Sequence, residues 1–158
     1  AFLPPGNYAG ARFGASNPAD EYVLAVRGGG TGDVTDTHVL WKHPTKQTDH
    51  VTSPLVVGGR MWLVKCGGIA TCFDTTDGKL LWGPKRINNA ADYFASPVYG
   101  DGKIYMAGEN GFVVVLKDGP ELEVLAKNDL GGSIVATPAV ADGRLYVRTR
   151  EALLCLGM

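Results

Sequence analysis

Short apolar runs alternate with glycine-containing turns along most of this chain. Residues 53–64, 96–107 and 137–148 read SPLVVGGRMWLV, SPVYGDGKIYMA and TPAVADGRLYVR. Each segment contains a β-rich run, a Gly-Gly or Asp-Gly turn, and a second β-rich run. Because these dipeptides tolerate the positive φ angles of tight hairpin turns, the pattern predicts a β-hairpin in each segment.

The three hairpins are copies of one repeat. Pro54, Pro97 and Pro138 are separated by 43 and 41 residues, and Trp41 and Trp82 are 41 apart. Further strand-like runs follow at IATCFDT, KLLWG, FVVVLKD and EVLAKND, and a weaker one at NYAGARF near the N-terminus. Four antiparallel strands in about 42 residues are typical of a propeller blade. Counting all the runs gives about fourteen strands.

Residues 72–82, CFDTTDGKLLW, resemble the quinoprotein (PQQ-like) propeller repeat. Its signature is a small residue, any residue, Asp, a glycine-containing turn, and Trp at the end of the fourth strand. Asp74 can accept hydrogen bonds from the turn amides, and Gly78 supplies a permissive backbone. Trp82 offers a flat surface to bury between adjacent blades, and Trp41 stands at the same repeat position.

The resemblance implies an all-β propeller of four-stranded antiparallel blades, with about 3.5 blades in this chain. One propeller segment spans residues 1–158, in which residues 1–36 form a partial blade with long loops and residues 37–157 carry clear repeats. An open arc exposes apolar faces and strand edges. We therefore expect a fragment of a longer propeller. Half of a dimeric ring and a compact closed form are the alternatives.

The third phase of the repeat departs from the signature. Lys117 stands at the position of the aspartate and Ala126 at that of the tryptophan, with one residue inserted between them. The blade interface there must be built differently.

The glycine run in RGGGTGDVTDTHVLW, residues 27–41, raises the question of a phosphate-binding loop. Such a loop needs a Gly-Lys-Ser/Thr ending and a following helix, and both are missing from the sequence. The run is instead predicted to be an enlarged turn between the strands EYVLAVR and THVLW. Asp33 and Asp36 are interpreted as turn or solvated residues in preference to calcium ligands.

Three cysteines, Cys66, Cys72 and Cys155, leave at least one unpaired within the chain. The spacing of the first two, with histidines only at 38, 43 and 50, matches no usual zinc motif. Cys72 and Cys155 occupy the same position of the repeat, which predicts a packing role for both.

Composition narrows the classes of partner. Of 158 residues, 45% are hydrophobic and 20% charged, which is typical of a globular protein. Fifteen basic and sixteen acidic residues give a formal net charge of −1, which does not favour nucleic acid or an anionic membrane surface. Apolar runs stay short of the roughly 18 residues that span a bilayer, so membrane insertion is not predicted.

Three function classes follow from the resemblance. The first is a non-catalytic scaffold or binding propeller of an exported, periplasmic or secreted bacterial protein. The second is part of a quinoprotein dehydrogenase that holds pyrroloquinoline quinone (PQQ) and calcium. The third is a structural or assembly subunit that self-associates to close or extend the propeller.

The residues favour the first class. The resemblance implies a vicinal Cys-Cys pair in many quinoprotein dehydrogenases, and this sequence has none. A Gly-x-Ser-x-Gly elbow, which would indicate a serine nucleophile, does not occur either. We therefore assign no catalytic, cofactor-binding or metal residue and expect no cofactor. Ser53, Ser96 and Thr137 share one repeat position, where a hydroxyl is predicted to bond to the backbone.

A binding surface is expected on the loops between the fourth strand of one blade and the first strand of the next, because loops on a rigid scaffold carry function. These loops are HPTKQTDH, GPKRINNAADY and NDLGGSI, and the second is the longest. It offers the candidate residues Lys85, Arg86, Asn88, Asn89, Asp92 and Tyr93. This set suits a polar ligand or the edge of a protein partner, and a solvated loop is the alternative. A second copy, or the remainder of a longer chain, is the other partner considered.

Overall fold

The computed structural model describes residues 2–3, 22–45 and 51–157, which are almost entirely β-structure. Its elements are β1 (Phe2–Leu3), β2 (Tyr22–Val26), α1 (Thr35–His38), β3 (Val39–Pro44), β4 (Leu55–Val57), β5 (Arg60–Lys65), β6 (Ile69–Asp74), β7 (Leu80–Arg86), β8 (Val98–Gly100), β9 (Lys103–Ala107), β10 (Phe112–Lys117), β11 (Val124–Asp129), β12 (Ala139–Ala141), β13 (Arg144–Arg148) and β14 (Leu153–Gly157). The weak strand predicted at NYAGARF lies outside the described residues.

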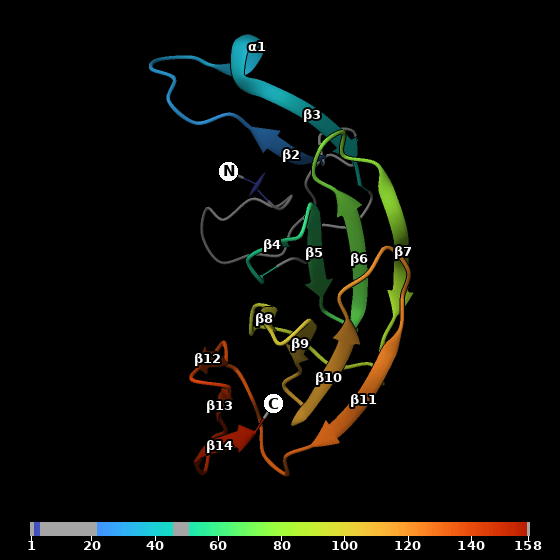
Figure 1. Cartoon of the computed structure of the whole chain (residues 1–158), viewed down its shortest axis with the longest axis vertical. Coiled ribbons are helices and arrows are strands. Elements are labelled where there is room, and N and C mark those ends of the chain that lie inside the picture. The colour runs from blue at the N-terminus through green and yellow to red at the C-terminus, as the bar shows by residue number, and fades with distance from the viewer. Residues whose placement is uncertain (1, 4–21, 46–50, 158) are drawn as a thin grey trace.

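Four small sheets follow one another along a curved arc (Figure 1). Each is an antiparallel meander, in the orders β1-β2-β3, β4-β5-β6-β7, β8-β9-β10-β11 and β12-β13-β14, and we call them blades 1 to 4. The short strands β4, β8 and β12 lie on the inner side of the arc, and β7 and β11 lie on the outer side. Two complete blades flanked by two three-stranded ones confirm the predicted partial propeller.

The hairpin turns have the backbone that the sequence predicts. Gly58, Asp101 and Asp142 have φ angles of 56°, 50° and 49°, and the glycine after each has a φ between 68° and 74°. Positive φ at both central residues is the requirement of a type I′ turn, whose twist matches that of the flanking strands. Each hairpin therefore joins the first and second strands of its blade with only two residues.

The glycine run connects β2 to β3, as predicted for an enlarged turn. The fourth strand of blade 1 begins at Val39, two residues later than THVLW suggests, because α1 forms a single helical turn before it. The carboxylate of Asp33 accepts the amide of Thr35 at 3.0 Å, and this bond lowers the pKa of Asp33 below its usual value. Asp33 therefore serves the turn. In the described part of the chain, no helix has the length and apolar character needed to cross a membrane.

The hydrophobic core lies between the blades. Successive residues of a strand point to opposite faces, so Trp62 and Val64 of β5 face blade 3 whereas Met61 and Leu63 face blade 1. Both faces of a complete blade are thus apolar and buried. The three interblade clusters centre on Met61, Leu63 and Phe73 for blades 1 and 2, on Trp62, Ile104 and Leu116 for blades 2 and 3, and on Tyr105, Ile134 and Leu145 for blades 3 and 4.

Candidate functional site

The repeat signature joins blade 1 to blade 2. The indole of Trp41 is buried and its Nε1 donates to the carbonyl oxygen of Thr75 at 2.9 Å. A Cβ on Gly78, whose φ is +73°, would lie 2.4 Å from Cε3 of that indole. The carboxylate of Asp74 accepts the amide of Thr76 at 2.7 Å, which lowers the pKa of Asp74. Because residue 78 is glycine, the Trp41 ring can lie directly on the turn after β6. The hydrogen bond to the Asp74 carboxylate holds the backbone of that turn.

Trp82 occupies the equivalent place between blades 2 and 3. It is 6% exposed and meets Trp62 edge to face, with ring centroids 5.6 Å apart. Unlike Trp41, its Nε1 has no hydrogen-bond partner among the described atoms. The turn after β10 differs in sequence from the turn after β6, and its Leu122 packs against the cluster that contains Trp82. At the interface between blades 2 and 3, apolar contacts therefore stand in place of the hydrogen bond that Trp41 makes between blades 1 and 2.

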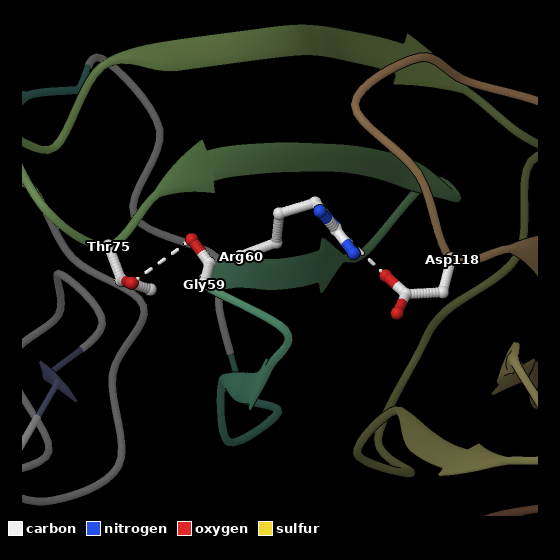
Figure 2. A network of polar contacts seen from close by, with 4 residues as sticks. All are labelled: Gly59, Arg60, Thr75 and Asp118. Carbon is white, nitrogen blue, oxygen red and sulfur yellow. Dashed lines mark hydrogen bonds and ion pairs between the residues drawn. The ribbon is translucent and has the colours of Figure 1, made fainter.

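An ion pair also ties blades 2 and 3 together. Arg60, the first residue of β5, extends across to Asp118, just after β10 (Figure 2). Its Nε lies 2.9 Å from the carboxylate, and the side chains are 24% and 12% exposed. The hydrogen bond to Asp118 raises the pKa of Arg60. Figure 2 also shows the hydroxyl of Thr75 donating to the carbonyl of Gly59 at 3.0 Å, which holds two turns of blade 2 together.

The repeated hydroxyls form a directional ladder across three blades. The amide of Ser53 donates to Oγ of Ser96 at 2.9 Å, and the amide of Ser96 donates to Oγ1 of Thr137 at 3.0 Å. Blades 3 and 4 thus each supply an acceptor to the blade before them. The hydroxyls of Ser96 and Thr137 bond to the backbone, as predicted, and each does so by accepting an amide of the neighbouring blade.

The candidate loop begins later than the sequence suggests. Strand β7 continues to Arg86 because Lys85 and Arg86 still pair with Ala70 and Ile69 of β6. Both basic residues are therefore exposed strand residues, and Nη1 of Arg86 donates to the carbonyl oxygen of Gly67. In the third predicted loop, NDLGGSI, the first two residues likewise belong to β11. Residues 46–50 of the first predicted loop lie outside the described residues.

The remaining candidates divide into exposed and buried residues. Asn89 and Asp92 are exposed, whereas Asn88 and Tyr93 are 7% and 0% exposed. Burial raises the pKa of Tyr93 to about 12. Its hydroxyl and Nδ2 of Asn88 lack hydrogen-bond partners among the described atoms.

Backbone bonds on both sides explain why this loop packs so closely. The amide of Gly67 in blade 2 donates to the carbonyl of Ala91, and the amide of Glu109 in blade 3 donates to the carbonyl of Asp92, each at 2.8 Å. The loop is therefore wedged between two blades. Among the six candidates, the accessible ones are Lys85, Arg86, Asn89 and Asp92.

Sequence reasoning missed an apolar feature of the same loops. Val51 and Val135 are 40% and 52% exposed, and each stands two residues before the hydroxyl residue of the ladder. Phe94, at the same repeat position, is half-buried. We call these three residues the apolar row. The repeat alignment was the signal that could have found them, because it places an apolar residue at this loop position in three successive units.

The three cysteines lie in different environments. Cys72 is fully buried, which raises the pKa of its thiol to about 12, and Cys66 is partly buried. Cys155 is exposed, contrary to the predicted packing role. Its position is equivalent to that of Cys72, but among the described residues no further blade covers this face of blade 4.

The described residues contain no group of three or more His, Cys, Asp or Glu side chains that could hold a metal ion. Trp62 and Trp82 are buried between blades, so neither indole offers a free face to a quinone ring. The resemblance implied a vicinal Cys-Cys pair for many dehydrogenases, and this sequence has none.

The sheets, the type I′ hairpins and the Trp-on-glycine contact define a PQQ-like β-propeller. The profile of the family described as outer membrane protein assembly factor BamB matches residues 7–120, and the chain belongs to this family.

Curated relatives and solved structures agree with this assignment. BamB of Yersinia pestis is 24% identical and that of Escherichia coli K12 is also 24% identical, over 89% of this chain in each case. The chain spans only 38% of the length of these relatives. The crystal structure of BamB from Moraxella catarrhalis superposes with a TM-score of 0.66 at 18% identity, over 87% of this chain and 40% of that one. The computationally designed Ika4 protein gives a TM-score of 0.60 at 13% identity, over 100% of this chain and 91% of that one. These structural matches show the fold.

Proposed function

We propose that this chain is a non-catalytic propeller segment that binds a protein partner within an exported, periplasmic bacterial protein. Membership of the BamB family supports this proposal, and curated relatives carry the name outer membrane protein assembly factor. By that likeness, the partner belongs to the machinery that assembles outer-membrane proteins. The proposed function requires neither PQQ nor calcium.

The apolar row is the observation that carries this proposal. Val51 and Val135 expose apolar side chains on loops of two blades, and half-buried Phe94 stands at the same position between them. Apolar residues repeated along one end of a rigid scaffold suit a protein interface. Exposed Arg86 at the end of β7 and exposed Asp92, two residues before Phe94, supply polar contacts of the kind that surround such a surface.

Photocrosslinking from single positions would test this surface. The chain is exported to the periplasm of Escherichia coli with a photoreactive residue at Val135, and in a control at Leu125 of β11, which is 46% exposed on the outer side of the arc. We expect adducts with a component of the outer-membrane assembly machinery from position 135 alone. Adducts of equal yield from position 125, or none from position 135, would contradict the proposed surface.

We further propose that the remainder of a longer chain completes the ring, with closure by a second copy as the alternative. The chain spans 38% of the length of the curated relatives, which favours the remainder of a longer chain over a second copy. Leu40 and Leu153 lie in the two terminal blades and are 53% and 68% exposed. Light scattering coupled to size exclusion should give no discrete dimer for the purified chain. A sharp peak at twice 16.7 kDa would instead support closure by two copies.

Titration with PQQ and calcium tests the dehydrogenase reading separately. We expect no change in the visible absorbance of the quinone on addition of the protein. Micromolar binding with a shifted spectrum would overturn the cofactor-free proposal without affecting the interface test.

A further inference from the structure

One asparagine of this chain stands directly before a glycine. The sequence contains six asparagines, and only Asn110 has this neighbour, since the others precede tyrosine, proline, asparagine, alanine or aspartate. Asparagine is among the thermally labile residues, because the main-chain nitrogen of the next residue can attack its side-chain amide. Glycine has no Cβ to hinder that approach. The pair Asn110-Gly111 therefore combines the most reactive neighbours in the sequence.

The structure places this pair where the reaction can occur. Asn110 is exposed in the turn between β9 and β10. Its Oδ1 accepts the amide of Phe112 at 3.4 Å, a long hydrogen bond that closes a ring containing Cγ of Asn110 and the nitrogen of Gly111. The Phe112 amide also points at the oxygen on which negative charge develops when Cγ is attacked. The turn thus brings together a nucleophile, an electrophile and an oxyanion donor.

The folded turn also restrains the nucleophile. The amide of Gly111 donates to the carbonyl of Gly108 at 3.0 Å, so the proton that must leave this nitrogen is held. The carbonyl of Gly111 accepts the amide of Leu130 at 3.0 Å, which joins the turn to the connection between blades 3 and 4. Attack therefore requires a local opening of the turn.

We propose that Asn110 is a site of spontaneous deamidation that loosens the joint between blades 3 and 4. The nitrogen of Gly111 attacks Cγ of Asn110, so an N–Cγ bond forms as the Cγ–Nδ2 bond breaks. Nδ2 leaves as ammonia with the proton of the Gly111 amide, and a five-membered succinimide remains. Water then opens this ring, at the main-chain carbonyl to give isoaspartate or at Cγ to give aspartate.

Isoaspartate changes the path of the main chain. The chain then runs through Cβ and Cγ of residue 110, which adds one methylene group before Gly111 and leaves a free carboxylate. Gly111 is buried, and the carbonyl oxygen of Gly132 lies 2.9 Å from the place of a Cβ on it. Because the turn has so little room, the added group should displace the Gly111 carbonyl from the Leu130 amide.

Blade 2 contains a matched turn that cannot react in this way. The carbonyl of Gly68 accepts the amide of Ile87 at 2.9 Å, as Gly111 accepts that of Leu130. The residue before Gly68 is Gly67, which has no side-chain amide. The Ile87 amide is therefore a control within the same molecule.

Incubation of the folded chain in mildly alkaline buffer, followed by peptide mapping, tests the modification site. We expect aspartate and isoaspartate at position 110, with about tenfold less product at each other asparagine, because a β-carbon on the following residue raises the barrier to ring closure. The synthetic peptide MAGENGFV, residues 106–113, should react about tenfold faster than the folded chain because it has no turn to open. Equal conversion at Asn88 or Asn128, or an intact Asn110 after the peptide has reacted completely, would overturn the site.

Hydrogen exchange tests the effect on the joint. In molecules that carry isoaspartate, separated chromatographically from unreacted chain, the Leu130 amide should exchange about fivefold faster, because it has lost one hydrogen bond. The Ile87 amide should keep its original rate. Asn110→Gln retains a side-chain amide but needs a larger ring, so the same incubation should leave its Leu130 exchange unchanged.

Two results would overturn the proposed loosening. One is unchanged Leu130 exchange in the modified molecules, and the other is equally accelerated exchange at Ile87. Both measurements use the chain without a partner, so neither result bears on the proposed partner interface.

Discussion

The indole Nε1 of Trp41 donates a hydrogen bond to the carbonyl oxygen of Thr75, 34 positions away in the chain, at 2.9 Å. This bond joins the fourth strand of blade 1 to the turn after the third strand of blade 2. The same ring rests where a side chain on Gly78 would lie. A single tryptophan therefore fixes two blades by both packing and a directional bond.

Replacement of Gly78 by alanine should lower the free energy of unfolding for two separable reasons. Its φ of +73° disfavours any L side chain, and the new methyl group would overlap the Trp41 ring. We expect a loss of about 3 kcal/mol in the free energy of unfolding, from about 1 kcal/mol of backbone strain and about 2 kcal/mol of overpacking.

Gly102→Ala is the matched control for this change. Its φ is +70°, but a Cβ there has no atom within 4 Å, so only the backbone cost of about 1 kcal/mol is expected. Urea unfolding of both variants measures the difference. Equal losses at the two positions would mean that the contact with Trp41 adds nothing to stability.

The sequence predicted the strands well because turn chemistry and alternation are local. Asp101-Gly102 and Asp142-Gly143 demand positive φ angles whatever surrounds them, so both hairpins could be placed in advance. The end of β7 could not, because Lys85 and Arg86 look like loop residues until their pairing with β6 is known. Strand length here depends on a partner strand.

The candidate loop shows the same limit in its side chains. Tyr93 and Asn88 are polar residues in a glycine-poor connection, and their composition alone suggested access to solvent. Their burial follows from backbone bonds between the loop and two different blades, which no local pattern encodes. The interblade pair Arg60 and Asp118 was missed for the same reason, since 58 positions separate its members.

The Arg60–Asp118 pair should contribute measurably to the joint between blades 2 and 3. Both side chains are partly buried, so solvent and salt screen the interaction less than at an exposed site. A double-mutant cycle with Arg60→Gln and Asp118→Asn should give a coupling energy of about 1 kcal/mol. The exposed pair Lys117–Glu123, within blade 3, is the control and should give a clearly smaller coupling energy. A coupling energy no larger than that of the control pair would show that the interblade pair contributes no more to stability than an exposed ion pair.

The hydroxyl ladder predicts a directional pattern of hydrogen exchange. Ser96→Ala removes the acceptor of the Ser53 amide but leaves the Ser96 amide bonded to Thr137. Thr137→Val removes the acceptor of the Ser96 amide alone. Each loss should cost about 1 kcal/mol, which corresponds to about fivefold faster exchange at the single affected amide. Faster exchange at both amides in either variant would show general loosening of the inner strands instead.

Alkaline pH should weaken the fold through Cys72. Burial raises the pKa of this thiol from its ordinary value of 9.0 to about 12. Its contribution to stability is therefore fully present below pH 9 and decreases as the pH rises to about 12. In that window the unfolded chain loses the proton while the folded protein keeps it, so the free energy of unfolding falls by up to about 1.4 kcal/mol per pH unit.

Denaturant unfolding between pH 8 and pH 11 measures this slope. Cys72→Ala should flatten it relative to the wild-type chain, although the variant also loses some packing and starts from a lower stability. Cys155→Ser replaces an exposed thiol and should leave the slope unchanged. Because Tyr93 is buried as well and its pKa is raised to about 12, part of the decline above pH 10 should persist in Cys72→Ala. A slope that is identical in all three proteins would rule out ionisation of Cys72 as a source of the alkaline weakening.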